Sequence, residues 1–330
     1  MRPEELDRAV GKGEIAPLYY IYGEEEFLVE RAVQRLMDAI VAPDFKDFNY
    51  SVFYGKEVRG EQIIESAMTL PMFAQRRVIL VKRADDMSAD AFEQLLSYLH
   101  NPSPESCVVF QGVKADQRRK FFQELKKADQ LVEFKKMKDD QLAGFIRREA
   151  EQRGKRIDAA AAEMIVYYSG NNLRELVAQV EKLASFCGER PTISPDDVRA
   201  MASDTKIDSV FELADAMGRR NLDKAMRQLQ TILRDSDAPY MLIGALARHF
   251  RQLCIIRALM QKRVPIDEIG RQAKVNPYFL KGLLEQARNF KPEDFAGIFT
   301  RLHEVDVELK RGGRQQTLLE MLVFSVCGCQ

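Results

Sequence analysis

The stretch TLPMFAQRRVILVK, Thr69–Lys82, combines two different structural patterns. Residues 78–81 are apolar and mostly β-branched, which is typical of a strand buried on both faces in a parallel sheet. Pro71, Met72 and Phe73 come just before that strand, where the chain should still be turning. An apolar turn has two interpretations: its side chains pack back onto the sheet as core, or they project outward as an anchor for a partner's pocket.

Strand-like and helix-like segments alternate around this stretch. An aromatic strand ends at Gly23, and the residues after this glycine include apolar side chains at helical spacing. Strands separated by helices of about ten residues or more predict parallel βαβ units and a covered sheet. We therefore expect residues 1–138 to form a doubly wound α/β domain. Its expected strands are 17–23, 48–55, 77–82, 106–112 and 130–134, and its expected helices are 24–40, 61–70, 88–99 and 116–128.

From Asp139 onward the pattern is helical, and we expect no further strands. Residues 139–205 predict a small helical domain, in which Gly170-Asn171-Asn172 should end one helix and start the next, and Ser194 should cap another. Residues 206–330 predict an all-helical bundle suited to oligomerisation. Its helix 241–260 is apolar around most of its circumference and should be central.

Length and composition limit the possible functions. The chain has 330 residues, enough for two or three domains, and its 50 Lys and Arg balance 50 Asp and Glu. Balanced charge argues against a protein that coats DNA through bulk charge, but it allows local basic patches. Five scattered cysteines, including Cys327 and Cys329, predict neither a disulfide framework nor a metal site. Without a stretch of about 18 apolar residues, we expect a cytoplasmic protein with no membrane partner.

The turn after the first strand is where a doubly wound sheet would hold a phosphate. A P-loop reads G-x-x-x-x-G-K-[ST], whereas Gly23–Phe27 contains one glycine, no lysine and three glutamates. Carboxylates at a helix N-terminus stabilise the helix and repel a polyphosphate. Lys82 and Arg83 stand where a hydrolase would place its magnesium-binding acid, with Asp85 and Asp86 slightly later. We interpret the domain as a nucleotide-binding fold that lacks the residues for nucleotide hydrolysis, and we expect no cofactor and no catalytic site.

Five stretches in the right order over the full length resemble the delta subunit family of the bacterial DNA polymerase III clamp loader. The resemblance implies an AAA+/RecA-like sheet domain, a helical lid and a helical collar that assembles subunits into a ring. The stretches are LYYIYGEEEFLVERAVQRL (18–36), LPMFAQRRVILVKRAD (70–85), GNNLRELVAQVEKL (170–183), FELADAMGRRNLDKAMRQLQTIL (211–233) with LIGALARHFRQL (242–253), and NPYFLKGLLEQARNF (276–290) with LHEVDVELKRG (302–312).

The resemblance implies a mechanical role in DNA replication, without ATP hydrolysis by this chain. Such a subunit belongs to a DNA-directed DNA polymerase holoenzyme, a nucleotidyltransferase, and binds and opens the beta sliding clamp. Its other implied partners are the delta prime and gamma or tau subunits and, within the assembly, primer-template DNA. By position, Leu70, Met72 and Phe73 would enter the clamp's hydrophobic cleft, with Pro71 shaping the turn. Met72 stands where the family often has leucine, a side chain of similar volume.

Basic residues in two places are weaker candidates for DNA contact, since phosphate contacts need only local positive charge. Their alternative interpretation is a solvated helix face or loop. Two other functions stay open: an NTPase with an unconventional site that uses Asp85 or Asp86 for magnesium, and a sequence-specific DNA-binding regulator, which the zero net charge disfavours. The basic candidates are Arg118, Arg119, Lys120, Lys310, Arg311 and Arg314.

Overall fold

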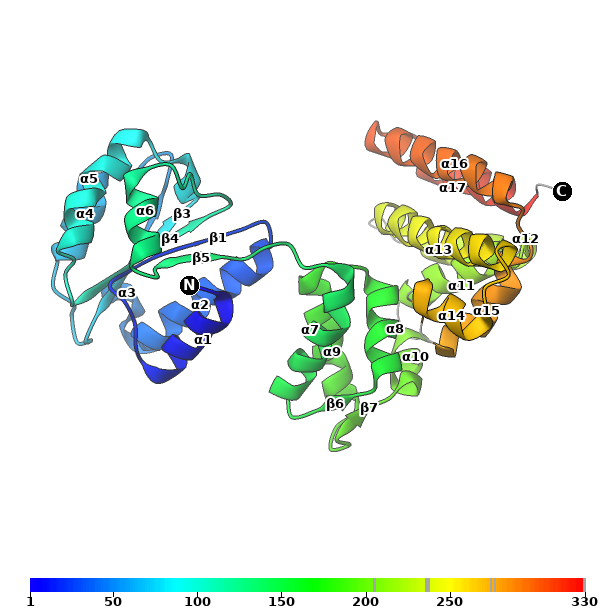
Figure 1. Ribbon diagram of the computed structural model, residues 1–330, viewed down its shortest axis with the longest axis horizontal. Helices are drawn as coiled ribbons and strands as arrows, with labels where there is room; N and C mark the ends of the chain where they lie inside the picture. The colour runs from blue at the N-terminus through cyan, green and yellow to red at the C-terminus, as the bar shows by residue number, and fades with distance from the viewer. Residues whose placement is uncertain (204–205, 235–237, 274, 276, 329–330) are drawn as a thin grey trace. The chain divides into compact units, whose positions relative to one another are not determined.

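The structure is a computed structural model, and it describes residues 1–203, 206–234, 238–273, 275 and 277–328. The chain divides into two compact units, Met1–Lys138 and Asp139–Gln330 (Figure 1). The division of the second unit between residues 205 and 206 stays a prediction, because the contacts define two units only. Cys329, one of the cysteines considered for metal binding, lies outside the described residues.

The first unit contains a sheet of five parallel strands in the order β2-β3-β4-β1-β5. The strands are β1 (Leu18–Tyr22), β2 (Tyr50–Tyr54), β3 (Arg77–Lys82), β4 (Ser106–Gly112) and β5 (Leu131–Glu133). The helices are α1 (Pro3–Lys12), α2 (Glu26–Ile40), α3 (Lys46–Asn49), α4 (Gly60–Met68), α5 (Ala89–His100) and α6 (Lys120–Lys127), with short 3-10 turns η1 (Pro43–Phe45) and η2 (Ala84–Asp86).

Helices cover both faces of the sheet because successive strand residues point to opposite sides. Tyr20 and Phe110 lie in a buried cluster with side chains of α4, α5 and α6. Tyr19 and Val109 lie in a second cluster with side chains of α1 and α2. Figure 1 shows the two helical layers on either side of the strands. The predicted fold class, an α/β sheet domain followed by helices, is confirmed.

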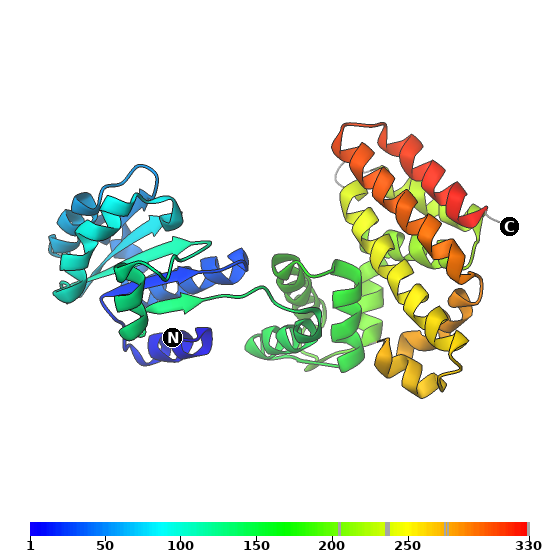
Figure 2. The same ribbon diagram turned by 45° about the horizontal axis from the view of Figure 1, so that its top comes forward.

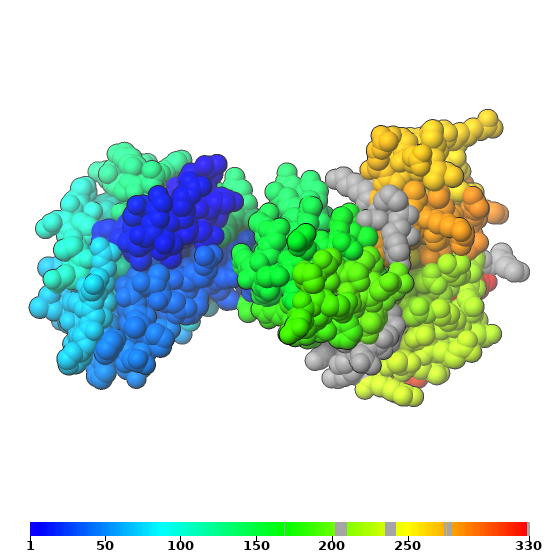
Figure 3. All heavy atoms as spheres, turned by 90° about the horizontal axis from the view of Figure 1, so that it is seen from below, coloured from blue at the N-terminus to red at the C-terminus, as the bar shows by residue number. Residues whose placement is uncertain are grey.

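Several details of the first unit differ from the sequence prediction. Phe48 and Asn49, expected at the start of a strand, belong to helix α3, and the helix expected over residues 61–70 ends at Met68. Helix α1 was not predicted, although Pro3 at its start and Gly13 just past its end, at φ 74°, are ordinary helix signals. It packs against α2, and its dark blue atoms are visible on the surface in Figure 3. Helix α6 begins at Lys120 and not near residue 116, because the Asp116 carboxylate accepts the Arg118 backbone N–H at 3.3 Å and stabilises a turn there.

The expectation that strands end at Asp139 was wrong. Strands β6 (Arg156–Ile157) and β7 (Thr192–Ile193) form a small parallel sheet in the second unit. Two-residue strands are too short to show a periodicity in the sequence. The helices of this unit are α7 (Asp139–Gln152), α8 (Ala159–Ser169), α9 (Leu173–Phe186), α10 (Pro195–Ser203), α11 (Lys206–Gly218), α12 (Leu222–Ile232), α13 (Ala238–Gln261), α14 (Ile266–Gln272), α15 (Pro277–Ala287), α16 (Pro292–Lys310) and α17 (Gln315–Cys327).

The predicted helix boundaries at residues 170–172 and 194 are confirmed. Gly170 follows α8 at φ 78°, a conformation that glycine adopts readily. Asn172 precedes α9, and its Oδ1 accepts the backbone N–H groups of Arg174 and Glu175. The Ser194 hydroxyl accepts the backbone N–H of Asp197 at 3.3 Å, as expected of an N-cap.

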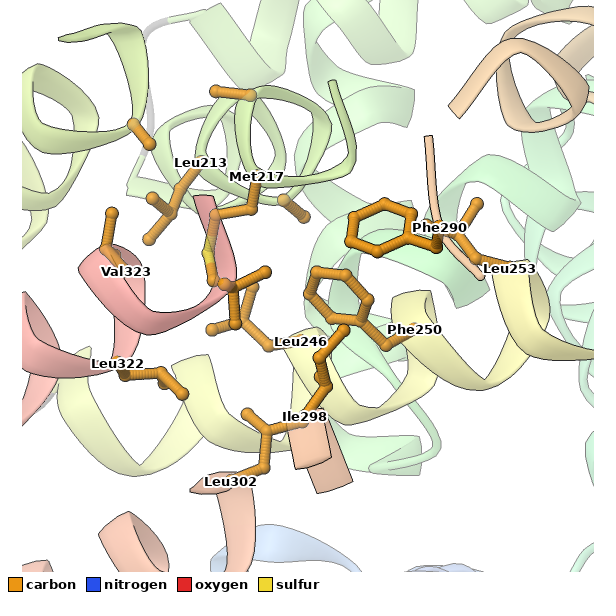
Figure 4. Packing of buried hydrophobic residues seen from close by; sticks show 14 of the residues in the cluster. Leu213, Met217, Leu246, Phe250, Leu253, Phe290, Ile298, Leu302, Leu322 and Val323 are labelled. Atoms are coloured by element: carbon orange, nitrogen blue, oxygen red, sulfur yellow. The ribbon is translucent and has the colours of Figure 1, made fainter. Parts of the chain in front are cut away.

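Helix α13 is central to its bundle, as predicted. It packs against α11, α15 and α16, and Figure 2 shows α16 and α17 running side by side in orange and red. Leu246, Phe250 and Leu253 of α13 are fully buried. Figure 4 shows Phe250 facing Phe290, whose ring centroid is 5.6 Å away in an edge-to-face arrangement. The apolar circumference of α13 is therefore explained by neighbours on several sides.

Candidate functional site

The apolar turn lies between α4 and β3, and we call Leu70–Phe73 the tip. Three of its side chains are exposed: Leu70 at 67%, Met72 at 51% and Phe73 at 78% of their full surface. Pro71 is partly buried. The tip side chains therefore do not pack into the core, and the first of the two interpretations of this turn is wrong in the described structure.

The backbone of the tip is held from inside the domain. Asn49, the last residue of α3, is fully buried, and its side chain forms two hydrogen bonds with Met72. Oδ1 accepts the Met72 N–H at 2.7 Å, and Nδ2 donates to the Met72 carbonyl at 2.6 Å. Just before the tip, Nη1 of the buried Arg77 lies 3.4 Å from the Thr69 carbonyl, to which it donates. The tip is therefore a held element of the fold that carries exposed apolar side chains.

Sequence reasoning missed Asn49 and Arg77. Arg77 left a signal, because a charged residue at the start of an apolar strand must find a partner if it is buried. Its guanidinium donates to the Ser51 hydroxyl at 3.3 Å as well as to Thr69. Asn49 left no local signal, since its partner Met72 lies 23 residues later.

The first basic group, in the first unit, forms local contacts. Nε of Arg118 lies 2.8 Å from the Asp116 carboxylate, and Nε of Arg119 lies 3.6 Å from it. The Arg119 guanidinium also lies 5.7 Å from the centre of the Phe92 ring. Lys120 is exposed at the start of α6. Asp116 offsets part of the positive charge of this group, which makes it a modest candidate for phosphate contact.

The second basic group lies at the α16–α17 connection in the other unit. Nζ of Lys310 is 2.6 Å from the Asp306 carboxylate, and Arg311 is 3.2 Å from Glu308. Arg314 precedes α17. Exposed pairs of this kind stabilise a protein by about 0–1 kcal/mol and leave the guanidinium and ammonium groups accessible. The two basic groups belong to separate units.

The place expected for a nucleotide holds a pocket of about 510 Å³ at the carboxyl ends of β1, β4 and β5. Its lining mixes signs of charge. Gly23 lies there at φ 150°, and a Cβ on it would stand 1.9 Å from the Phe134 carbonyl oxygen. Close backbone packing therefore accounts for this glycine without a phosphate. The pocket is lined by Tyr22, Gly23, Glu24, Val113, Lys114, Ala115, Gln117, Glu133, Lys135 and Lys136.

Asp85, the candidate magnesium ligand, has a structural contact. Its Oδ1 accepts the backbone N–H of Val113 at 3.1 Å and so joins the ends of β3 and β4. Asp86 forms an ion pair with Arg83 at 2.9 Å. Within the described residues, no group of three His, Cys, Asp or Glu side chains is placed to hold a metal ion. Nor is any helix among them long and apolar enough to cross a bilayer.

The five-stranded covered sheet, its apolar tip and the helical second unit define a protein of the clamp-loader type. Two family models match the chain: "DNA polymerase III, delta subunit" over residues 19–135, and "DNA polymerase III delta subunit, C-terminal domain" over residues 207–326. Together they cover more than two thirds of it. The chain belongs to the DNA polymerase III delta subunit family, whose members are subunits of the clamp loader.

Similar proteins match over nearly the whole length. DNA polymerase III subunit delta of Bacillus subtilis is 27% identical over 330 residues, covering 97% of this chain and 95% of the relative. The probable DNA polymerase III subunit delta of Aquifex aeolicus is 19% identical over 302 residues, covering 88% and 85%. Among solved structures, the Bacillus subtilis DNA clamp loader delta protein has a TM-score of 0.67 and 26% identity, covering 99% of this chain and 100% of that one.

Proposed function

We propose that this chain binds the beta sliding clamp through the tip and holds one interface of the ring open, so that the clamp can be loaded on primed DNA. The observation that supports the proposal is the exposure of Leu70, Met72 and Phe73 on a backbone that Asn49 and Arg77 hold. Exposed apolar side chains on a held turn offer a partner a rigid anchor. Family membership makes the clamp the natural partner.

The energetics of such a tip are sufficient for specific binding. A few apolar residues near the centre of an interface usually carry most of its free energy, about 2 kcal/mol or more each. Two anchors lost together therefore correspond to roughly a hundredfold or greater loss of affinity. Because the tip backbone is already ordered, little conformational entropy is lost on binding.

We further propose that the chain neither binds nor hydrolyses ATP. Support comes from the carboxylates of the turn at Gly23, from the mixed charge of the adjacent pocket, and from the structural hydrogen bond of Asp85. Neighbouring clamp-loader subunits would then bind ATP, and the delta prime and gamma or tau subunits would assemble with this chain through its helical region 206–330. Primer-template DNA would meet the basic groups within that assembly, which we expect in the cytoplasm.

The test is a binding measurement on the purified full chain with the sliding clamp of the same organism. The variant Met72→Ala/Phe73→Ala removes two anchors and should weaken binding at least a hundredfold while circular dichroism shows an unchanged fold. The matched control is Met321→Ala/Phe324→Ala, since these residues are the same two types and are 60% and 52% exposed in the other unit. The control should bind the clamp as the wild type does.

Two results would contradict the proposal. Equal affinity of the tip variant and the wild type would remove the tip as the anchor. No binding of the wild-type chain to the clamp would remove the clamp as the partner and leave only the family relationship.

A further inference from the structure

Asn49 is an uncharged polar side chain that is fully buried beside an exposed functional turn. Its amide forms three hydrogen bonds: Nδ2 donates to the carbonyls of Met72 at 2.6 Å and Phe45 at 3.1 Å, and Oδ1 accepts the Met72 N–H at 2.7 Å. Both N–H groups of the amide are therefore used, and so is its oxygen. Met72 receives from one side chain the pair of hydrogen bonds that a neighbouring strand would otherwise provide.

We propose that Asn49 is a positioning residue for clamp binding, which presets the conformation of the tip before the partner arrives. The inference rests on the proposed function of the tip. Met72 lies between Pro71 and Phe73, so holding its N–H and carbonyl sets the direction of the side chains on both sides. Asn49 itself lies inside the domain and does not need to touch the clamp.

The tip has a conformation that requires such support. Phe73 has φ 57°, a left-handed value that costs a residue with a Cβ about 1 kcal/mol or more. Strained backbone of this kind persists only where its surroundings determine it. The hydrogen bonds to Met72 fix the residue just before Phe73, and a released tip would relax toward ordinary backbone conformations.

The segment that carries Asn49 also supports the exposed ring. Phe45, whose carbonyl accepts from Asn49, has its ring centroid 6.4 Å from that of Phe73, with the two planes inclined by 30°. One short segment, residues 45–49, therefore contacts the tip twice, at the Met72 backbone and at the Phe73 side chain. Truncating the amide would free the first contact and weaken the second.

The consequence for binding follows from the population of the competent conformation. For a partner that binds only one conformation of a turn, the apparent dissociation constant equals the intrinsic dissociation constant divided by the fraction of molecules in that conformation. If the tip without its hydrogen bonds occupies that conformation a tenth of the time, the apparent affinity falls about tenfold. The loss would occur although every tip side chain is present.

The test compares Asn49→Ala with Ser88→Ala in the full chain. Ser88 caps α5 in the same unit by accepting the Ala91 N–H at 3.1 Å, so its loss lowers stability without a contact to the tip. Asn49→Ala should raise the dissociation constant for the clamp about tenfold or more. Ser88→Ala should leave that dissociation constant unchanged, although the two variants should have similar melting temperatures. In the background Met72→Ala/Phe73→Ala, Asn49→Ala should have no further effect.

Hydrogen exchange of the wild-type chain gives a second measurement that needs no variant. The Met72 amide, which donates to Asn49, should be protected although its side chain is exposed, and Asn49→Ala should abolish that protection. Rapid exchange of Met72 in the wild type would overturn the proposal. So would a folded Asn49→Ala chain with wild-type affinity, whereas failure of the proposed function would show separately as unchanged binding of Met72→Ala/Phe73→Ala.

Discussion

The Tyr167 hydroxyl lies 2.6 Å from Nδ1 of His249, which joins α8 to the centre of α13 across 82 residues of sequence. The histidine is buried, and its ring also stacks edge-to-face on Phe250 at 5.6 Å. Tyr167 in turn contacts the ring of Phe211, with centroids 4.4 Å apart. A polar pair inside an aromatic cluster therefore links the segment predicted as a lid to the segment predicted as a collar.

This pair predicts that acid destabilises the second unit. Burial lowers the pKa of His249 from 6.5 to about 4, although the Gln286 side chain and the Asp215 carboxylate act in the opposite direction. Between these values the unfolded chain binds a proton that the folded chain does not, so the free energy of unfolding falls as pH decreases. The loss from pH 7 to pH 4 should reach about 3 kcal/mol. Urea unfolding followed by helical circular dichroism measures it, and His249→Gln should flatten the dependence; an equal slope in the variant would contradict this assignment.

Gly23 should be irreplaceable for packing. In Gly23→Ala the new Cβ would meet the Phe134 carbonyl at 1.9 Å, at a φ that L residues rarely adopt, so we expect a loss of more than about 2 kcal/mol in the free energy of unfolding. Gly11→Ala, in α1 with nothing within 4 Å, should instead stabilise by about 0.5–1 kcal/mol. Thermal unfolding of both variants checks the contrast, and a harmless Gly23→Ala would mean that β5 can move aside.

Magnesium and ATP should leave the purified chain unchanged. A ligand present at a hundred times its dissociation constant stabilises a protein by about 2.7 kcal/mol, which a melting experiment detects easily. We expect no shift of the melting temperature at millimolar Mg-ATP. The three glutamates after Gly23 repel phosphates, and the Asp85 carboxylate accepts a hydrogen bond from the Val113 backbone N–H. A clear shift that Asp85→Ala removes would favour the unconventional NTPase instead.

The exposed face of α17 should serve assembly with other clamp-loader subunits. Met321 and Phe324 are exposed on this helix at i, i+3 spacing, while Leu322 and Val323 face the core. Met321→Asp/Phe324→Asp should weaken assembly at least tenfold, measured by analytical ultracentrifugation, and change stability by less than about 0.5 kcal/mol. Ile266→Asp, equally exposed on α14, is the control. Unimpaired assembly of the α17 variant would place the contact elsewhere.

Several features of the fold could be predicted because they follow from local patterns. Apolar runs of strand length that alternate with helical periodicity predicted the covered parallel sheet. The order of its strands could not be predicted, because it depends on which strands pair in space. Gly170, Asn172 and Ser194 marked helix ends through their own conformational and hydrogen-bonding preferences. Strands β6 and β7 escaped prediction because two residues carry no period.

The sequence by itself determined that an apolar turn precedes β3 and that the turn after β1 lacks the residues of a P-loop. It did not determine whether Met72 and Phe73 are core or surface, because either outcome satisfies the same pattern of residues. Tertiary structure decided this, by placing Asn49 from a distant segment against the Met72 backbone while leaving the side chains exposed. Burial and long-range hydrogen bonds depend on which segments meet in space, and local sequence preferences do not carry that information.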